Sequence, residues 1–305
     1  MEMRITPQII ASEAIANAQE QTSQLAILQQ QASTGLRILQ PSDDPTAALE
    51  VMADQAQNNQ LNVYQQNISD AQAKLNSSVS TLNQVSNLLT QAKDLGLQGS
   101  NNPNSPTALQ AMAAQVNSIL QEVIQLANTQ QNNQYLYGGT ASQSQPFTVN
   151  AQGQVVYNGS DQSMSEPTSQ GLQVQTLYNG SQIFQSPDVF QTLSGLSNAL
   201  SNVNNVPTSA QTAAIQQSLT ELDSANTSIL DVVGQQSASL QNLQGINQQI
   251  QDVQLQTTQT IGNLQDADLS QVVVGMQEQQ NLLQATLYSA TRVMSLSLLN
   301  FMGLP

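Results

Sequence analysis

The sequence predicts a mainly α-helical protein, in which the N- and C-terminal halves form a long antiparallel helical rod and a small β-rich domain is inserted at the far tip. Apolar heptads occupy both ends of the chain, long helical periodicities follow inside them, and short β-branched and aromatic runs lie in the middle. Because this order is symmetric about the middle, we expect the chain to run out and fold back on itself.

The first predicted helix covers residues 8–33, where helix breakers are few. Its apolar positions follow the spacing of three and four residues that is typical of a coiled-coil seam, and Gln21 is the one polar interruption. The seam positions are Ala11, Ala14, Ala18, Leu25, Leu28 and Ala32. Gly35 follows at the point where we expect this helix to end.

The second predicted helix is long and begins at a helix-start motif, Ser42, Asp43, Asp44 and Pro45. Asp44 suits the N-cap position because its carboxylate can accept from free backbone N–H groups. Pro45 suits the first helical position, where its missing N–H costs nothing. We expect the helix to run to about residue 97.

Glycines and a turn separate this helix from a third one. Gly96 and Gly99 are expected to end the long helix, and the Asn- and Pro-rich segment 100–106 is typical of a turn. Apolar residues at helical spacing then resume over 107–128.

The β-rich segment covers residues 135–186, where β-branched and aromatic runs alternate with glycines. Two Tyr-Asn-Gly sequences, at 157–159 and 178–180, are strong signals for hairpin turns. We interpret the tyrosines of this segment as core residues of a small sheet, and glycan binding by them is the alternative. These tyrosines are Tyr135, Tyr137, Tyr157 and Tyr178.

Helical spacing returns at 189, and a second long helix is expected over 208–264. Asp268 can cap a final helix, whose seam has Gln280 and Ser297 as polar interruptions. The apolar seam positions of this helix are Met276, Leu283, Leu287, Ala290, Met294 and Phe301.

Seams at both ends suggest that the two termini pair as helices. Burial contributes about 2 kcal/mol per seam position, whereas ordering the backbone costs about 1–2 kcal/mol per residue, so an isolated pair is marginal. Neighbouring copies can bury the remaining faces. We therefore predict that both ends are mobile in the monomer and become ordered only in the assembled state. The residues singled out for assembly are Leu25, Leu28, Ala32, Met276, Leu283, Leu287, Ala290, Met294 and Phe301.

Composition excludes several functional classes. Of the 305 residues, 39% are hydrophobic, 8% are charged and only five are Lys or Arg, and the formal net charge is −15. An acidic chain with so few cations is a poor binder of nucleic acid and of anionic lipid. No stretch approaches the roughly 18 apolar residues of a membrane span, so we expect no membrane insertion.

The residue types of common catalytic chemistry are missing. The chain has neither His nor Cys, which removes the usual general base, the thiolate nucleophile and most transition-metal sites. Two carboxylate pairs remain, Asp43 with Asp44 and Asp266 with Asp268, and we interpret both as helix caps. We therefore expect no enzyme activity, no cofactor and no metal.

Residue strings at both ends resemble the bacterial flagellin superfamily. They are Arg4-Ile5-Thr6, the stretch 32–48 with its Ser-Thr-Gly-Leu-Arg-Ile-Leu-Gln-Pro-Ser-Asp-Asp-Pro core, and the C-terminal stretches 282–287 and 298–301. The Pro-Ser-Asp-Asp-Pro version and the string Tyr-Leu-Tyr-Gly-Gly-Thr at 135–140 are similar to superfamily members that join the flagellar hook to the filament.

The resemblance implies three domains. A terminal coiled-coil domain, ordered on assembly, would comprise 1–40 and 266–305, a helical rod domain 41–134 and 187–265, and a β-rich insertion 135–186. It also implies a structural subunit that is exported by the flagellar apparatus and forms an extracellular junction ring between hook-side proteins and the flagellin filament. The partners it implies are neighbouring copies in the ring, the other hook-associated protein on the hook side, flagellin and an export chaperone.

Two other functions remain open. A flagellin filament subunit would share the terminal helices but would polymerise into long filaments instead of stopping at a short ring. A surface adhesin, from a different class, would use the β-rich insertion to bind glycans through its tyrosines.

Overall fold

The computed structural model describes residues 7–101, 104–185, 188–202 and 209–301, without the side chains of 7–8, 10–11, 293–294 and 296–301. Long α-helices account for most of these residues, and three short two-stranded hairpins lie between them. The helices are α1 (Pro7–Thr34), α2 (Pro45–Ser100), α3 (Pro106–Ala127), α4 (Val189–Ser201), α5 (Ser209–Gln265) and α6 (Leu269–Phe301). The predicted fold class, mainly α with a small β-containing region, is confirmed.

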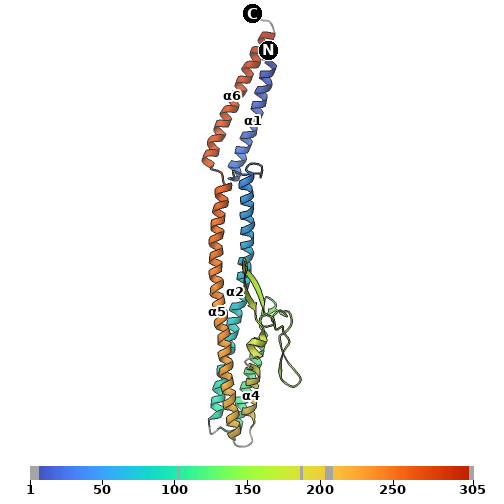
Figure 1. The fold of residues 1–305 in the computed structure, drawn as a ribbon, viewed down its shortest axis with the longest axis vertical. Coiled ribbons are helices and arrows are strands. Elements are labelled where there is room, and N and C mark those ends of the chain that lie inside the picture. The colour runs from blue at the N-terminus through green and yellow to red at the C-terminus, as the bar shows by residue number, and fades with distance from the viewer. Residues whose placement is uncertain (1–6, 102–103, 186–187, 203–208, 302–305) are drawn as a thin grey trace. The chain divides into compact units, whose positions relative to one another are not determined.

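The chain divides into two compact units. Unit 1 comprises Met1–Asn59 and Val253–Pro305, and unit 2 comprises Gln60–Asp252. In unit 1, α1 runs beside α6, and in unit 2, α2 runs beside α5 (Figure 1). Each unit therefore combines segments from both halves of the chain, as the symmetric element order predicts.

The helices of unit 2 pack in antiparallel pairs. The Lys93 ammonium lies 2.6 Å from the Asp223 carboxylate, and the Ser86 hydroxyl donates to the Asn226 amide oxygen at 2.6 Å, which fixes α2 against α5. Helices α3 and α4 form a second pair, and the Ser197 hydroxyl of α4 donates to a carbonyl of α3. The largest fully buried side chains are Ile68, Leu75, Leu82, Leu89, Leu109, Leu136, Tyr137, Phe147, Leu177, Phe184, Leu193 and Leu196.

Gly96 and Gly99 do not end α2, which continues to Ser100. A Cβ atom on Gly96 would lie 2.7 Å from Leu219, and one on Gly99 would lie 2.3 Å from Leu200. Leucine side chains of α5 and α4 pack directly against the α2 backbone at these two glycines, so the glycines mark helix contacts and not the end of the helix. Sequence alone does not separate these two uses of glycine.

The β region consists of hairpins β1–β2 (Gln130–Gln131 and Gln134–Tyr135), β3–β4 (Phe147–Val149 and Val155–Tyr157) and β5–β6 (Met164–Ser169 and Leu172–Leu177). The predicted Tyr-Asn-Gly turns are wrong, because 157–159 and 178–180 follow the paired strands instead of joining them. The turns of β3–β4 and β5–β6 contain Gly153 and Gly171, and the turn of β1–β2 consists of Asn132 and Asn133, all at positive φ.

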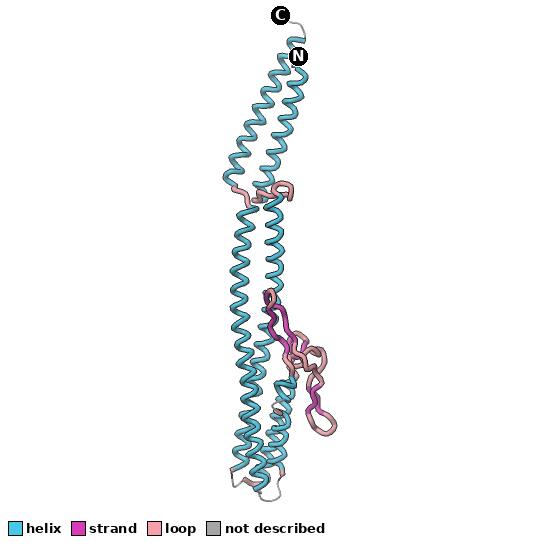
Figure 2. The backbone as a smooth tube through the Cα atoms, in the orientation of Figure 1, coloured by secondary structure: helices cyan, strands magenta, loops and turns pink. Residues whose placement is uncertain are grey.

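The hairpins lie beside the middle of α2, not beyond the end of the helical hairpin as expected (Figure 2). The Asn67 amide donates to the Pro167 carbonyl at 2.8 Å, and the Tyr137 and Ser78 hydroxyls lie 3.2 Å apart. The reason is α3, whose 22 residues carry the chain roughly 33 Å back from the end of α2 before the first strand begins. The junction of α2 and α3, and not the strands, therefore lies at the end of the helical hairpin in unit 2.

An ion pair holds the longest hairpin against α2. The Lys74 ammonium lies 2.6 Å from the Glu166 carboxylate, and the two side chains are only 8% and 18% exposed. Nearby, the ring of Phe184 contacts those of Tyr137 and Phe147 edge to face, at centroid distances of 5.1 and 5.4 Å. The β region thus shares one core with the helices of unit 2.

Candidate functional site

The surface with the strongest functional signal is the pair formed by α1 and α6 in unit 1. The side chain of Leu28 lies 3.5 Å from the position that a Cβ on Gly275 would occupy, so Leu28 of α1 packs against α6 at this glycine. The predicted seam residues Leu25, Leu28, Ala32, Met276, Leu283 and Ala290 are half-buried. The side chains of Met294 and Phe301 lie outside the described residues.

Leu287 is not part of the intramolecular seam, because 51% of its surface is exposed. The covered face of α6 includes the predicted interruption Gln280, with Gln279 beside it, but it has Thr286 in place of Leu287. Its buried and half-buried residues are Val272, Gly275, Met276, Gln279, Gln280, Leu283, Thr286 and Ala290. Apolar residues on the neighbouring face of α6 are therefore exposed in the described part of the chain.

Exposed large apolar side chains are concentrated in unit 1. On α6, Leu269, Val273 and Leu287 lie within about 40° of one another around the helix axis, so they share one strip of the surface. Gln280 and Gln284 interrupt this strip between Val273 and Leu287. The exposed large apolar residues in the described part of unit 1 are Ile9, Ile15, Ile27, Leu49, Met52, Leu255, Leu269, Val273, Val274, Leu282, Leu287 and Tyr288. Only Ile38, Ala47, Ala48, Val51 and Val272 are buried apolar residues among those described in the same unit.

The predicted polar interruption at Gln21 has a physical counterpart. Its Oε1 atom is buried and accepts no hydrogen bond from the described part of the chain. A buried acceptor without a donor costs about 1–3 kcal/mol. The amide therefore weakens the pairing of α1 with α6 within one molecule.

The helix-start motif adopts the predicted geometry at the start of α2. The Asp44 carboxylate accepts from the Ala47 N–H at 3.1 Å, and Pro45 is the first helical residue, which confirms both predicted roles. Asp43 instead accepts from the N–H groups of Leu39 and Gln40 at 2.9 and 2.8 Å, and so closes the loop before the helix. Ser42 is exposed, and its hydroxyl makes no hydrogen bond with the described residues.

Arg37 joins this loop to the end of α5, a role that the sequence pattern did not reveal. Its Nη2 atom donates to the Leu264 carbonyl at 2.7 Å, its backbone N–H donates to the Gln265 carbonyl, and its guanidinium lies 3.5 Å from Asp44. The available signal was the scarcity of cations, since Arg37 is the only Lys or Arg between Arg4 and Lys74. Asp268 caps α6 as predicted, accepting from the N–H groups of Ser270 and Gln271.

A small hollow of about 140 Å³ lies beside this loop, lined by residues of 38–41 and the first turns of α2. Ile38, Ala48 and Val51 form its apolar side, and Met52 at its rim is 59% exposed. The hollow is large enough for one aliphatic side chain. It lies in the same unit as the exposed apolar strip of α6.

Three of the four predicted core tyrosines of the β region pack into or against the protein core, and Tyr135 is half-buried. Tyr137 is fully buried and its hydroxyl contacts Ser78, and burial raises the pKa of Tyr137 far above its ordinary value. The Tyr157 hydroxyl donates to backbone carbonyls of Tyr137 and Ser160, and burial raises its pKa as well. Tyr178 is half-buried, with its pKa raised by burial. These side chains serve as core residues, which the sequence interpretation favoured over glycan binding.

Among the described residues, no group of three or more carboxylates lies close enough to hold a metal ion. No helix within the described ranges is long and apolar enough to cross a bilayer.

Comparison with known proteins points to one family. Residues 5–142 match the family described as bacterial flagellin N-terminal helical region. The sequence is 26% identical to flagellar hook-associated protein 3 of Salmonella typhimurium, over 97% of this chain and 98% of that protein. It is 27% identical to a flagellin of Clostridium tyrobutyricum, but over only 45% of this chain and 37% of that protein.

Solved structures share the fold. FlgL of Xanthomonas campestris superposes with a TM-score of 0.63 at 16% identity, over 69% of this chain and 99% of its own. Flagellar hook-associated protein 3 of Legionella pneumophila gives a TM-score of 0.65 at 17% identity, over 70% of this chain and 98% of its own. The chain is thus similar to hook-associated protein 3 along almost its whole length, and its first half resembles the N-terminal helical region of bacterial flagellin.

Proposed function

We propose that this relative of hook-associated protein 3 is a structural subunit of the bacterial flagellum and forms the ring that connects hook-side proteins to the flagellin filament. The observation that carries the proposal is the terminal helix pair, which leaves a strip of Leu and Val side chains exposed while unit 2 buries its own core. The similarity to hook-associated protein 3 along almost the whole chain supports the same role.

Assembly follows from the uncovered surface of unit 1. Each exposed Leu or Val that a neighbouring copy buries contributes about 1.5–3 kcal/mol to association. Leu287, which the intramolecular pair leaves exposed, fits a contact between copies better than a contact within one copy. The predicted assembly positions Met294 and Phe301 continue along the same helix and remain part of this proposal.

The partners follow from the position of the ring. We infer contacts with copies of the same chain on either side, with the other hook-associated protein on the hook side and with flagellin on the filament side. A flagellar export chaperone would cover the terminal helices before export, and the assembled subunit is extracellular. The role requires no catalytic step, no cofactor and no metal.

A filament-forming flagellin is the second candidate in the same class. The similarity to flagellin covers less than half of either chain, whereas the similarity to hook-associated protein 3 covers almost all of both, so the junction role is favoured. The adhesin alternative is weakened because Tyr137 is buried in the core and Tyr157 and Tyr178 pack against it.

The test is a strain that lacks this chain, complemented with the full sequence or with a truncation of 280–305. The full chain should restore filament attachment. The truncated chain should be exported and fold in unit 2, but flagellin should be shed into the medium. Normal incorporation of the truncation would refute the proposed role of α6, and long homopolymers of the purified full chain would favour the flagellin alternative.

A further inference from the structure

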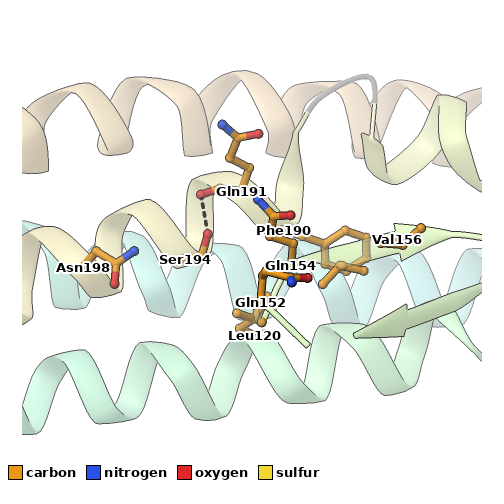
Figure 3. Close-up of a pocket in the computed structure, with 10 residues that line it drawn as sticks. Leu120, Gln152, Gln154, Val156, Phe190, Gln191, Ser194 and Asn198 are labelled. Carbon is orange, nitrogen blue, oxygen red and sulfur yellow. Dashed lines mark hydrogen bonds between the residues drawn. The ribbon is translucent and has the colours of Figure 1, made fainter. Parts of the chain in front are cut away.

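A cleft of about 460 Å³ in unit 2 is separate from the terminal helices and has no part in the proposed assembly. It lies between the β3–β4 hairpin and α4, with Leu120 of α3 contributing to its lining. Figure 3 shows Gln191, Ser194 and Asn198 along α4, Gln152, Gln154 and Val156 on the hairpin, and Leu120 and Phe190 between them. This volume is within the range of sites that bind small ligands or short peptides.

One wall of the cleft is a strand edge that lacks a partner. The β3–β4 ladder closes through Asn150 with Gln154 and through Pro146 with Asn158, so the backbone groups of Val155 and Tyr157 point away from β3. No hydrogen bond joins these outward groups to the described residues. The hairpin residues that line the cleft are 152–156, so the cleft opens on the β4 side.

The opposite edge of the same hairpin is occupied at Phe147. The Asn128 side chain accepts from the Phe147 N–H at 3.0 Å and donates to the Phe147 carbonyl at 2.9 Å. This amide makes the same pair of bonds that a neighbouring strand would make. The difference between the two edges indicates that the β4 edge, not the hairpin as a whole, is available for pairing.

The other wall of the cleft is a polar stripe on α4. Gln191, Ser194 and Asn198 are spaced by three and four residues, so they lie on one face of the helix. The side-chain amides of Gln191 and Asn198 form no hydrogen bond with the described part of the chain. The stripe is about 10 Å long, which matches three residues of extended chain and the three residues of β4.

We propose that this cleft binds an extended, uncharged peptide segment, which adds to the edge of β4 as a third strand and receives hydrogen bonds from the α4 amides on its other side. The lining contains no charged residue, so a charged side chain entering the cleft would lose water without gaining a partner. Phe190 and Leu120 form an apolar floor, which suits one aliphatic side chain at the centre of the segment.

The test uses the full-length, isotope-labelled chain and the blocked pentapeptide Ser-Gln-Val-Gln-Ser as probe. Addition of the peptide to about 10 mM should shift the backbone amide signals of 152–156 and the side-chain amide signals of Gln191 and Asn198. The same peptide with N-methylated valine and the neutral trisaccharide maltotriose should cause no such shifts. Shifts with the saccharide but not with the peptide would overturn the proposal, as would no response to the peptide.

Two proline variants separate edge pairing from general effects on the hairpin. Val155→Pro removes the outward N–H at the cleft edge without touching the β3–β4 ladder, and should weaken peptide binding at least roughly tenfold. Val149→Pro makes the same change on the opposite edge and should bind as the unchanged chain does. Equal binding by both variants would contradict the proposal.

A third variant does not depend on the hairpin's tolerance of proline. The double substitution Gln191→Ala and Asn198→Ala removes the α4 amides from exposed positions, so the fold should be retained. It should weaken binding of the pentapeptide roughly threefold to tenfold, and the double substitution Gln241→Ala and Gln248→Ala on the exposed face of α5 should not. Unchanged affinity after loss of the α4 amides would refute their role.

Discussion

Unit 1 and unit 2 are built from the same two long helices but bury very different amounts of apolar surface. Five apolar residues are buried in the described part of unit 1, against twelve large apolar residues that are exposed. In unit 2 this balance is reversed, and a single cluster links α2, α3, α4, α5 and the β region. This difference shows that apolar spacing along two helices is not enough to make a stable unit. Four helices and a β region complete a core, whereas a terminal pair needs neighbours.

Alkaline pH should unfold unit 2 because its buried tyrosines ionise. This is the largest effect that we expect. Burial raises the pKa of Tyr137, Tyr157 and Tyr178, so the folded state favours their neutral forms. This stability is fully present below the unfolded pKa of about 10 and is lost as pH rises through the folded values. Circular dichroism across pH 8–12 should show cooperative unfolding above about pH 10. Tyr137→Phe should shift the transition upward, and an unshifted transition would contradict this assignment.

Truncation of a buried aromatic side chain in unit 2 should destabilise the protein much more than truncation of a seam residue in unit 1. Phe184→Ala should destabilise unit 2 by about 3–5 kcal/mol, because the side chain is fully buried among aromatic neighbours. Leu28→Ala in the half-buried seam should cost under about 1 kcal/mol in the monomer. Urea unfolding of both variants measures the loss of unfolding free energy. Equal losses would contradict the expected difference between the two units.

The Lys74–Glu166 pair should matter more when one partner is removed than when both are. Lys74→Ala leaves a carboxylate that is only 18% exposed, and we expect a loss of about 3 kcal/mol. The double substitution Lys74→Met and Glu166→Met removes both charges and should restore most of the stability. Thermal unfolding of the single and double variants is the measurement, and additive losses would show that the charges do not act as a pair.

Removal of the unpaired amide in unit 1 should strengthen the terminal pair. Gln21→Leu should slow hydrogen exchange in α1 and α6 of the monomer roughly tenfold, because a buried acceptor without a donor is removed. Gln24→Leu, the same change at an exposed position of α1, is the matched control. The prediction fails if both variants behave alike.

The helix-start motif should give the smallest effect. Asp44→Ala should cost about 1 kcal/mol through loss of the N-cap of α2. Asp44→Asn keeps an oxygen acceptor but removes the charge beside Arg37, and at 3.5 Å and partial exposure this contact contributes less than about 1 kcal/mol. Exchange rates at the first turn of α2 separate the two contributions.

Local sequence signals predicted the helices well, because apolar spacing, caps and breakers act within a few residues. The caps at Asp44 and Asp268 and the bounds of the long helices needed no tertiary information. The helix contacts at Gly96 and Gly99 could not be predicted without knowing which helices pack there, because a glycine can either end a helix or allow a neighbour to approach it. The place of the β region depended on the direction of α3, which periodicity does not give.

The candidate site was predicted only in part for a related reason. Leu287 was assigned to the α6 seam for its apolar character, but the covered face has Thr286 there instead, because the partner helix and not hydrophobicity sets which flank is covered. The bonds of Arg37 to the end of α5 join residues 227 apart in sequence, and no local pattern reports them. The cleft beside β4 arises from three separate elements and left no signal in the sequence.

Hydrogen exchange measured on the purified monomer and on assembled junction material tests the central claim most directly. We predict rapid exchange across 8–33 and 270–301 in the monomer, slow exchange in the core of unit 2, and slow exchange throughout after assembly. Protection of α1 and α6 in the isolated monomer at the level of the unit 2 core would contradict it.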